Sequence, residues 1–302
     1  MLQEAKPSEA YPTTLLQSFE GYPLRIHPGL RDPDFPRRRV RQNKWSVKVR
    51  FRGIITDMKG KVNLDAISVV LVRPKFPENI GSVARAMKNM GLSRLIIVEG
   101  VSPLEIHAYK LASGAEEILE RADEFSSLRE AIAGMGCVVG MTSRQGRGRN
   151  PLLTPEALAR ILLPLSLKNS IGLVFGSEKD GLTNDELSLC HLYARIPTVE
   201  SFPSLNLAHA VMVIGYELFK ATGPLLTHPL QVAPAEDLEN MFEHMEKTLR
   251  GIGFFNANHP KRIMGALRRI FGRSEMDERE VRILQGIWSR VDWLIRERKK
   301  SN

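Results

Sequence analysis

Short apolar runs alternate with longer amphipathic stretches through the middle of the chain. The runs are rich in β-branched residues and are bounded by polar loops. They lie at residues 67–72, 95–98, 137–142, 171–175 and, more briefly, 193–196. Runs of this length that are apolar on both faces are typical of strands buried in a parallel sheet. The pattern therefore predicts an α/β domain over residues 65–225, with helices on both faces of a parallel sheet.

Helix-start signals separate these strands. Residues 127–130 and 183–186 have the spacing of capping boxes, and Thr154–Pro155 places a cap before a first-turn proline. An apolar stripe predicts a helix from about Asn79 to Met90, and a second stripe predicts a buried helix within residues 204–220. The helices needed to cover a parallel sheet are therefore present.

A proline-rich linker follows, and the chain then becomes helical. We expect residues 226–302 to form this linker and a small all-helical extension. Its amphipathic stretches lie at about 235–250, 260–272 and 277–298. Asp277 and Glu280 would cap the last helix. The apolar face of that helix would consist of Leu284, Ile287, Val291 and Leu294.

The first 64 residues show little periodicity. Residues 37–52 contain eight basic and no acidic residues, which is typical of a disordered segment or a basic arm. We therefore expect residues 1–64 to form a basic, disordered extension. Met58 directly precedes the first convincing strand, so a second interpretation stays open, in which residues 1–57 come from a misassigned start.

Composition narrows the class of protein. The chain has 302 residues, is 43% hydrophobic and carries a net charge of +9. The surplus of Lys and Arg lies in residues 1–57 and 235–302, which favours a polyanionic partner, although solubility alone would explain a modest surplus. The sequence has no apolar run long enough to span a bilayer and no signal-peptide pattern, so we expect a cytoplasmic protein without membrane association. Cys137 and Cys190 are expected to be buried, reduced thiols.

Polar residues follow several predicted strands, at the edge where parallel sheets bind ligands. Asn79 and Arg85 follow the first strand, and they would face one site only if Asn79 belongs to the loop or the cap, because six helical residues turn through about 240°. Glu178 lies between Gly176 and Gly181 in a tight loop, "FGSEKDG". Plain alternatives are an N-cap for Asn79, a solvated arginine for Arg85 and a simple turn for the loop.

The helix within residues 204–220 begins with two polar residues. Ser204 would cap it, which leaves Asn206 unexplained as a poor helix former in the first turn. A separate loop, "TSRQGRGRNP", places Arg144, Arg147 and Arg149 between glycines, which suits phosphate oxygens unless the loop is merely soluble.

Three segments in this order resemble the SpoU/TrmH superfamily of RNA ribose 2'-O-methyltransferases, and most of all its TrmJ-like tRNA methyltransferase subgroup. They are "PENIGSVARAMKNMGL", "LVFGSEKDGLTNDEL" and "IPTVESFPSLNLAHAVMVIGYE". The tail, "FEHMEKTLRGIGFFNANHPKRIMGALRRIFGRSEMDEREVRILQGI", resembles the C-terminal extension of that subgroup. The resemblance implies a trefoil-knotted parallel-sheet methyltransferase domain, S-adenosyl-L-methionine as cofactor and a homodimer.

The resemblance also implies a set of site residues. The catalytic set falls on Asn79, Arg85, Glu178, Ser204 and Asn206. The cofactor would contact Thr142, Ser143, Arg144, Gly176, Ile196, Pro203, Ser204 and Leu205. Two departures from the family pattern are the spacing of the arginine loop and the proline at 203.

In this interpretation Arg85 grips the target phosphate and stabilises the alkoxide as it forms. A phosphate oxygen or Arg85 itself takes the proton, and Asn79, Ser204 and Asn206 orient the ribose and the arginine. Glu178 would fix either Arg85 or the loop by a charge-assisted hydrogen bond. A sulfonium methyl donor needs no metal, so no metal is expected.

The implied substrate is tRNA, at cytidine or uridine 32 near the start of the anticodon loop. The residues expected to contact RNA are Arg144, Arg147, Arg149, Lys261, Arg262, Arg268 and Arg269. The same helical tail would alternatively serve dimer packing. Two other functions stay open: methylation of ribosomal RNA, and RNA binding without catalysis.

Overall fold

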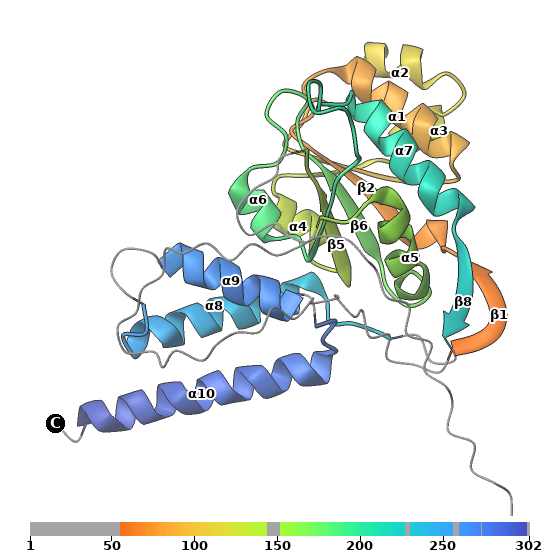
Figure 1. Cartoon of the computed structure of the whole chain (residues 1–302). Helices are drawn as coiled ribbons and strands as arrows, with labels where there is room; N and C mark the ends of the chain where they lie inside the picture. Colours follow the sequence, from red (N-terminus) through yellow and green to blue (C-terminus); the bar gives the residue numbers. More distant parts are fainter. Residues whose placement is uncertain (1–54, 144–151, 227–229, 256–259, 273, 301–302) are drawn as a thin grey trace, which may run out of the picture. The chain divides into compact units, whose positions relative to one another are not determined.

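The computed structural model describes residues 55–143, 152–226, 230–255, 260–272 and 274–300. Its centre is a six-stranded, wholly parallel sheet with the strand order β4-β3-β2-β6-β5-β7 (Figure 1). The strands are β2 (Ile67–Val72), β3 (Arg94–Val98), β4 (Asp123–Phe125), β5 (Cys137–Met141), β6 (Ile171–Phe175) and β7 (Leu192–Ala194). The predicted α/β class and parallel sheet are confirmed. β7 ends two residues earlier than the sequence suggested.

Helices cover both faces of the sheet, as the apolar strands require (Figure 1). One face carries α1 (Pro77–Asn89), α2 (Ile106–Ala112), α3 (Glu116–Glu120), α5 (Pro155–Leu165) and α7 (Leu207–Lys220). The other carries α4 (Leu128–Ile132) and α6 (Asn184–Ser188). Alternate residues of β2 enter the two cores, since Val69 and Leu71 pack on one side and Val70 and Val72 on the other.

A second, two-stranded sheet joins the two ends of this domain. β1 (Ile55–Lys61) runs antiparallel to β8 (Thr222–Leu226), with Lys61 opposite Thr222. Residues 55–61 were expected within a disordered extension, yet they form a strand that contains Met58. A 3-10 turn (Leu64–Ala66) leads from β1 into β2. Residues 1–54, including the basic segment, lie outside the described residues.

The three C-terminal helices form their own apolar core. They are α8 (Ala235–Gly251), α9 (Pro260–Gly272) and α10 (Glu278–Lys300), close to the predicted bounds. The predicted cap is confirmed, because the Glu280 backbone N–H donates to Asp277 Oδ1 over 2.8 Å and the Asp277 N–H donates to Glu280 Oε2 over 3.2 Å.

The apolar face predicted for α10 is partly wrong. Val281, Leu284 and Trp288 pack against the core of the helical domain, whereas Ile287 and Leu294 are 49% and 53% exposed. The helix is turned because Asp292 faces α8. There its carboxylate accepts hydrogen bonds from Thr248 Oγ1 (2.8 Å) and contacts His244 Nε2 (3.0 Å). The contacts of Asp292 with Thr248 and His244 therefore accompany a rotation of α10 about its axis that the pattern of apolar residues did not predict.

A buried asparagine fixes the path of the linker. Asn169 Nδ2 donates to the carbonyls of Leu165 (2.8 Å) and Leu230 (2.9 Å), and Asn169 Oδ1 accepts from Val232 N–H (2.9 Å). Next along the chain, the Ala235 N–H donates to the Met135 carbonyl over 2.8 Å. These bonds attach the start of the helical extension to the α/β domain.

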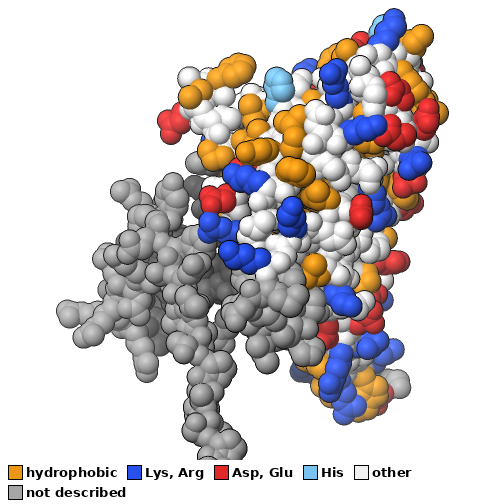
Figure 2. Space-filling model, turned by 90° about the vertical axis from the view of Figure 1, so that its right-hand side faces the viewer, with side chains coloured by type: hydrophobic (Ala, Val, Ile, Leu, Met, Phe, Trp, Pro, Cys, Tyr) orange, Lys and Arg blue, Asp and Glu red, His pale blue; other side chains and the backbone are white. Residues whose placement is uncertain are grey.

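Large hydrophobic side chains remain exposed on α7. Tyr216 and Phe219 are 51% and 53% exposed. The side of the molecule that carries α1 and α7 has hydrophobic side chains gathered in its upper half among Lys and Arg (Figure 2). Such a surface is typical of a protein contact.

Both cysteines are buried and free, as predicted. Burial raises the pKa of the Cys137 thiol to about 12 and raises the pKa of Cys190 as well. Within the described part of the chain, no helix combines the length and apolar character needed to cross a membrane.

The surroundings of His191 lead us to predict that the protein becomes less stable at acid pH. Burial lowers its pKa from 6.5 to about 4, and its Nδ1 accepts a hydrogen bond from Val138 N–H over 3.2 Å. Between these two pH values the unfolded chain binds a proton that the native imidazole does not bind. The free energy of unfolding should therefore fall, by at most about 3 kcal/mol, as pH drops from 6.5 to 4.

Urea unfolding across this pH range measures the effect. His191→Gln lacks the titrating group, so its unfolding free energy should depend less steeply on pH than that of the wild-type protein. Equal slopes for the two proteins would contradict this origin.

Candidate active site

The loops that follow β5, β6 and β7 meet at the carboxyl edge of the sheet and, with the start of α7, enclose a pocket. The empty space amounts to about 870 Å³, including open solvent. Its apolar part is lined by Met141, Phe175, Leu182, Ala194, Ile196, Leu205, Leu207 and Ala210. Its polar part is lined by Thr142, Ser143, Ser177, Glu178, Lys179, Asp180 and Ser204. A pocket with an apolar side and charges of both signs suits a ligand that joins an apolar ring to charged groups.

A chain of hydrogen bonds joins the three sequence motifs beside this pocket. Asn79 Nδ2 donates to Glu178 Oε1 over 2.9 Å, and Asn206 Nδ2 donates to Asn79 Oδ1 over 3.1 Å. Asn206 Oδ1 in turn accepts from the backbone N–H groups of Ala208 (2.9 Å) and His209 (3.4 Å). The start of α1, the loop after β6 and the start of α7 are therefore linked through two side-chain amides.

The orientation of both amides follows from their partners. A carboxylate only accepts and a backbone N–H only donates, so Asn79 must turn its nitrogen to Glu178 and Asn206 must turn its oxygen to the start of α7. Asn206 is thus the N-cap of α7. The expectation that Ser204 caps this helix is wrong, because the helix begins at Leu207, three residues beyond Ser204.

Asn79 lies inside α1 and does not cap it. The helix begins at Pro77, with Phe76 at the N-cap position. Glu178 also accepts from the Lys75 backbone N–H (3.1 Å), so its negative charge lies at the positive end of α1. We expected Glu178 to bind either Arg85 or the loop. It binds the backbone at Lys75 and the side chain of Asn79, and it does not bind Arg85.

Arg85 is not brought to this cluster within one chain. It is exposed and lies six helical residues beyond Asn79, on another side of α1. Among the described residues its side chain has no hydrogen-bond or ion-pair partner, and the same holds for Ser204. Ser204 lines the pocket, whereas Arg85 does not.

The loop after β6 is held in a tight turn. Ser177 and Gly181 form an isolated antiparallel bridge, and Gly181 N–H donates to the Ser177 carbonyl over 2.9 Å. Gly181 has φ +66°, and a Cβ on Gly176 would lie 2.1 Å from the Gly181 carbonyl carbon. Gly176 is therefore required for close contact within the loop itself, in keeping with the tight turn predicted between Gly176 and Gly181.

Most of the residues expected to hold the cofactor do line the pocket. They are Thr142, Ser143, Gly176, Ile196, Pro203, Ser204 and Leu205. Arg144, Arg147 and Arg149 lie outside the described residues.

The basic residues of α9 differ in their surroundings. Arg262 is exposed. Arg268 pairs with Glu239 and lies over the Phe242 ring, 4.7 Å from its centroid, so its charge is used inside the helical domain. Arg269 is partly buried, and the side chain of Lys261 lies outside the described part. Arg268 is therefore poorly placed for the RNA contact expected of it.

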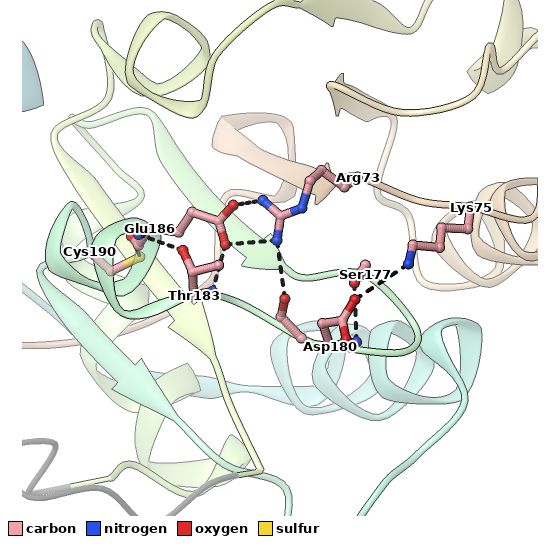
Figure 3. Close-up of polar contacts among 8 residues, drawn as sticks. Arg73, Lys75, Ser177, Asp180, Thr183, Glu186 and Cys190 are labelled. Atoms are coloured by element: carbon pink, nitrogen blue, oxygen red, sulfur yellow. Dashed lines mark hydrogen bonds and ion pairs between the residues drawn. The ribbon is translucent and has the colours of Figure 1, made fainter.

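Sequence reasoning missed two residues of the site. Arg73 and Lys75, directly after β2, both contact the loop after β6 (Figure 3). The available signal was the pair of basic residues at the carboxyl end of a buried strand, opposite a loop with two acidic residues.

Comparison with known proteins agrees with this geometry. Residues 66–216 match the SpoU rRNA Methylase family, and residues 236–302 match the C-terminal domain of tRNA methyltransferase TrmJ. The chain is 41% identical to the tRNA (cytidine/uridine/adenosine-2'-O-)-methyltransferase TrmJ of Pseudomonas aeruginosa, over 74% of this chain and 93% of that protein. It is 38% identical to the tRNA (cytidine/uridine-2'-O-)-methyltransferase TrmJ of Salmonella typhimurium, over 76% and 97%.

A solved structure gives the same result. The crystal structure of TrmJ from Z. mobilis ZM4 superposes with a TM-score of 0.66 at 33% identity, over 74% of this chain and 98% of that one. The chain therefore belongs to the SpoU methylase family. Within that family it is similar to the TrmJ proteins, in the α/β domain and in the helical extension.

We predict that two substitutions of Asn206 destabilise the protein to different extents. Asn206→Ala removes both the cap of α7 and the bond to Asn79, so the free energy of unfolding should fall by about 1–2 kcal/mol. Asn206→Ser keeps a capping oxygen and loses only the amide donor, so its loss should be smaller. Urea unfolding at pH 7.5 measures both, and equal losses would contradict the capping role.

Proposed function

We propose that this protein transfers a methyl group from S-adenosylmethionine to a ribose 2'-hydroxyl of tRNA, at cytidine or uridine 32 in the anticodon loop. The observation that carries this proposal is the hydrogen-bonded cluster of Asn79, Glu178 and Asn206 beside the pocket. The printed activities of the TrmJ relatives support tRNA and pyrimidine nucleotides as substrates.

The pocket suits the methyl donor. S-adenosylmethionine supplies an activated methyl group on a sulfonium, beside an ammonium and an adenine ring. Ile196, Leu205 and Ala210 offer apolar contact for the ring, and the loop after β6 brings charges of both signs through Glu178, Lys179 and Asp180. The hydroxyls of Thr142 and Ser143 and the backbone of the loop at Gly176 complete the set of polar groups.

The residues of the cluster would position the acceptor. Glu178 holds Asn79 and the chain at Lys75, so these groups are fixed before RNA arrives. Ser204, which is exposed at the pocket, would donate to or accept from the ribose. The guanidinium of Arg85 carries only N–H donors and has no acceptor, so it cannot take up a proton. We therefore assign it to the target phosphate and to the negative charge that grows on the 2'-oxygen, with a phosphate oxygen taking the proton.

A homodimer would complete this site. Arg85 lies on an exposed side of α1, away from Asn79, so the Arg85 that serves a given pocket would come from the other chain. Tyr216 and Phe219 on α7 provide exposed apolar surface for such a contact. We also propose the trefoil knot of the resembling family and a cytoplasmic location. Two observations support the knot. The chain crosses from β6 past β5 to β7, and Asn206, which follows β7, then contacts Asn79 of α1.

Arg85→Ala should separate binding from catalysis. It should bind S-adenosylmethionine as tightly as the wild-type protein and lose about 100-fold or more in methyl transfer, because only the group that meets the transition state is removed. Isothermal titration and transfer of a labelled methyl group measure the two quantities. Arg94→Ala is the matched control, since Arg94 is exposed at the amino end of β3. Wild-type turnover by Arg85→Ala would refute the assignment.

The substrate is tested with separate tRNA and rRNA transcripts. The family model that matches residues 66–216 is named for rRNA, so methylation of rRNA is the second candidate. We expect label in tRNA alone, and mapping of the modified nucleotide should place it at position 32. Label in rRNA alone would support the second candidate, and label in neither would support RNA binding without catalysis.

A further inference from the structure

The segment directly after β2, which carries Arg73 and Lys75, contacts the loop after β6 at several points (Figure 3). Arg73 Nη2 donates to Glu186 Oε2 over 3.1 Å and to the Gly181 carbonyl over 3.4 Å, and Arg73 Nη1 pairs with the other oxygen of Glu186. Lys75 lies 3.4 Å from Asp180 through its Nζ. Residues more than 100 positions apart in the sequence are thereby tied together.

The Arg73–Glu186 pair is the stronger of these contacts. It is bidentate, and its side chains are only 29% and 13% exposed. Glu186 is itself held by the capping box of α6, in which it accepts from Thr183 N–H over 2.6 Å. The Lys75–Asp180 pair is 47% and 60% exposed, and pairs that exposed contribute little.

The left-handed backbone conformation of Arg73 indicates that its side chain serves a function. Its φ is +51°, a region that residues other than glycine seldom adopt. The Arg73 N–H donates to the Val98 carbonyl over 2.7 Å, which holds this turn at the end of β2. Glycine would take the same conformation without strain but would supply no guanidinium.

The contact reaches the pocket through the loop. Gly181, whose carbonyl Arg73 holds, has its backbone packed directly against Gly176, and both residues line the pocket. A shift of Gly181 must therefore move the wall of the pocket. We propose that Arg73, paired with Glu186, is a positioning residue that fixes this loop for binding of the methyl donor. The proposal rests on the proposed function.

Two single variants and their combination test it. Arg73→Gln removes the charge of the arginine, and Glu186→Gln removes that of the carboxylate while keeping an oxygen for the Thr183 N–H. Each should weaken binding of S-adenosylmethionine about tenfold in isothermal titration. The double variant should be no weaker than either single variant, because both lose the same pair.

Steady-state kinetics supply the second measurement. The KM for S-adenosylmethionine should rise in each variant while the KM for tRNA stays at the wild-type value, a split that a general loss of stability would not produce. Arg160→Gln is the matched control. It breaks the exposed Arg160–Glu156 pair on α5 and should leave both constants unchanged.

Wild-type affinity for S-adenosylmethionine in Glu186→Gln and Arg73→Gln, with a lowered melting temperature, would overturn the proposal and leave a purely structural ion pair. If Arg73→Gln does not fold, Glu186→Gln together with Arg73→Lys decides the matter. The wild-type protein is measured first, and lack of donor binding there would refute the proposed function instead.

Discussion

The side-chain amide of Asn79 holds the candidate active site together. It donates to a carboxylate of the loop after β6 and accepts from the residue that caps α7, so three segments of the chain share one group. A hydrogen bond to a charged partner contributes more than a neutral one, about 1.5–3 kcal/mol. Without this amide, Glu178 and Asn206 would lose their common partner, and the loop after β6 and the start of α7 would lose their hydrogen-bonded link.

The parallel sheet makes this arrangement possible. Because all six strands run in one direction, the first turn of α1, which carries Asn79, and the loops that carry Glu178 and Asn206 reach the same edge. Glycine at 176 and the left-handed turn at Arg73 then bring the loop after β6 against the chain that leaves β2. The helical extension is fixed elsewhere, through the linker around Asn169 and the first turn of α8.

Local rules account for what the sequence could predict. Five of the six strands of the parallel sheet, the caps at Thr183 and Asp277 and the three C-terminal helices depend on neighbouring residues, and these were found, whereas the short strand β4 was missed. The pairing of β1 with β8 joins distant parts of the chain and leaves no local signal. The rotation of α10 depends on the contact of Asp292 with Thr248 of α8. The residue that caps α7 depends on the position at which this helix begins. The cluster at Asn79 was predicted from motif resemblance, whereas spacing alone left Asn79 as a plain cap.

The bonds of Asn79 also bear on how the protein folds. They join residues 99 and 127 positions apart, so neither can form until most of the α/β domain has been brought together. Contacts of such long range are slow to form, because a large loop must close before they are made. During synthesis the cluster cannot assemble before Asn206 has left the ribosome, by which time β2, β3 and β6 are already available to pair. The central pairing of β2 with β6 has the same long range, because Ile67 lies opposite Ile171, so the sheet and the cluster depend on closure of the same part of the chain.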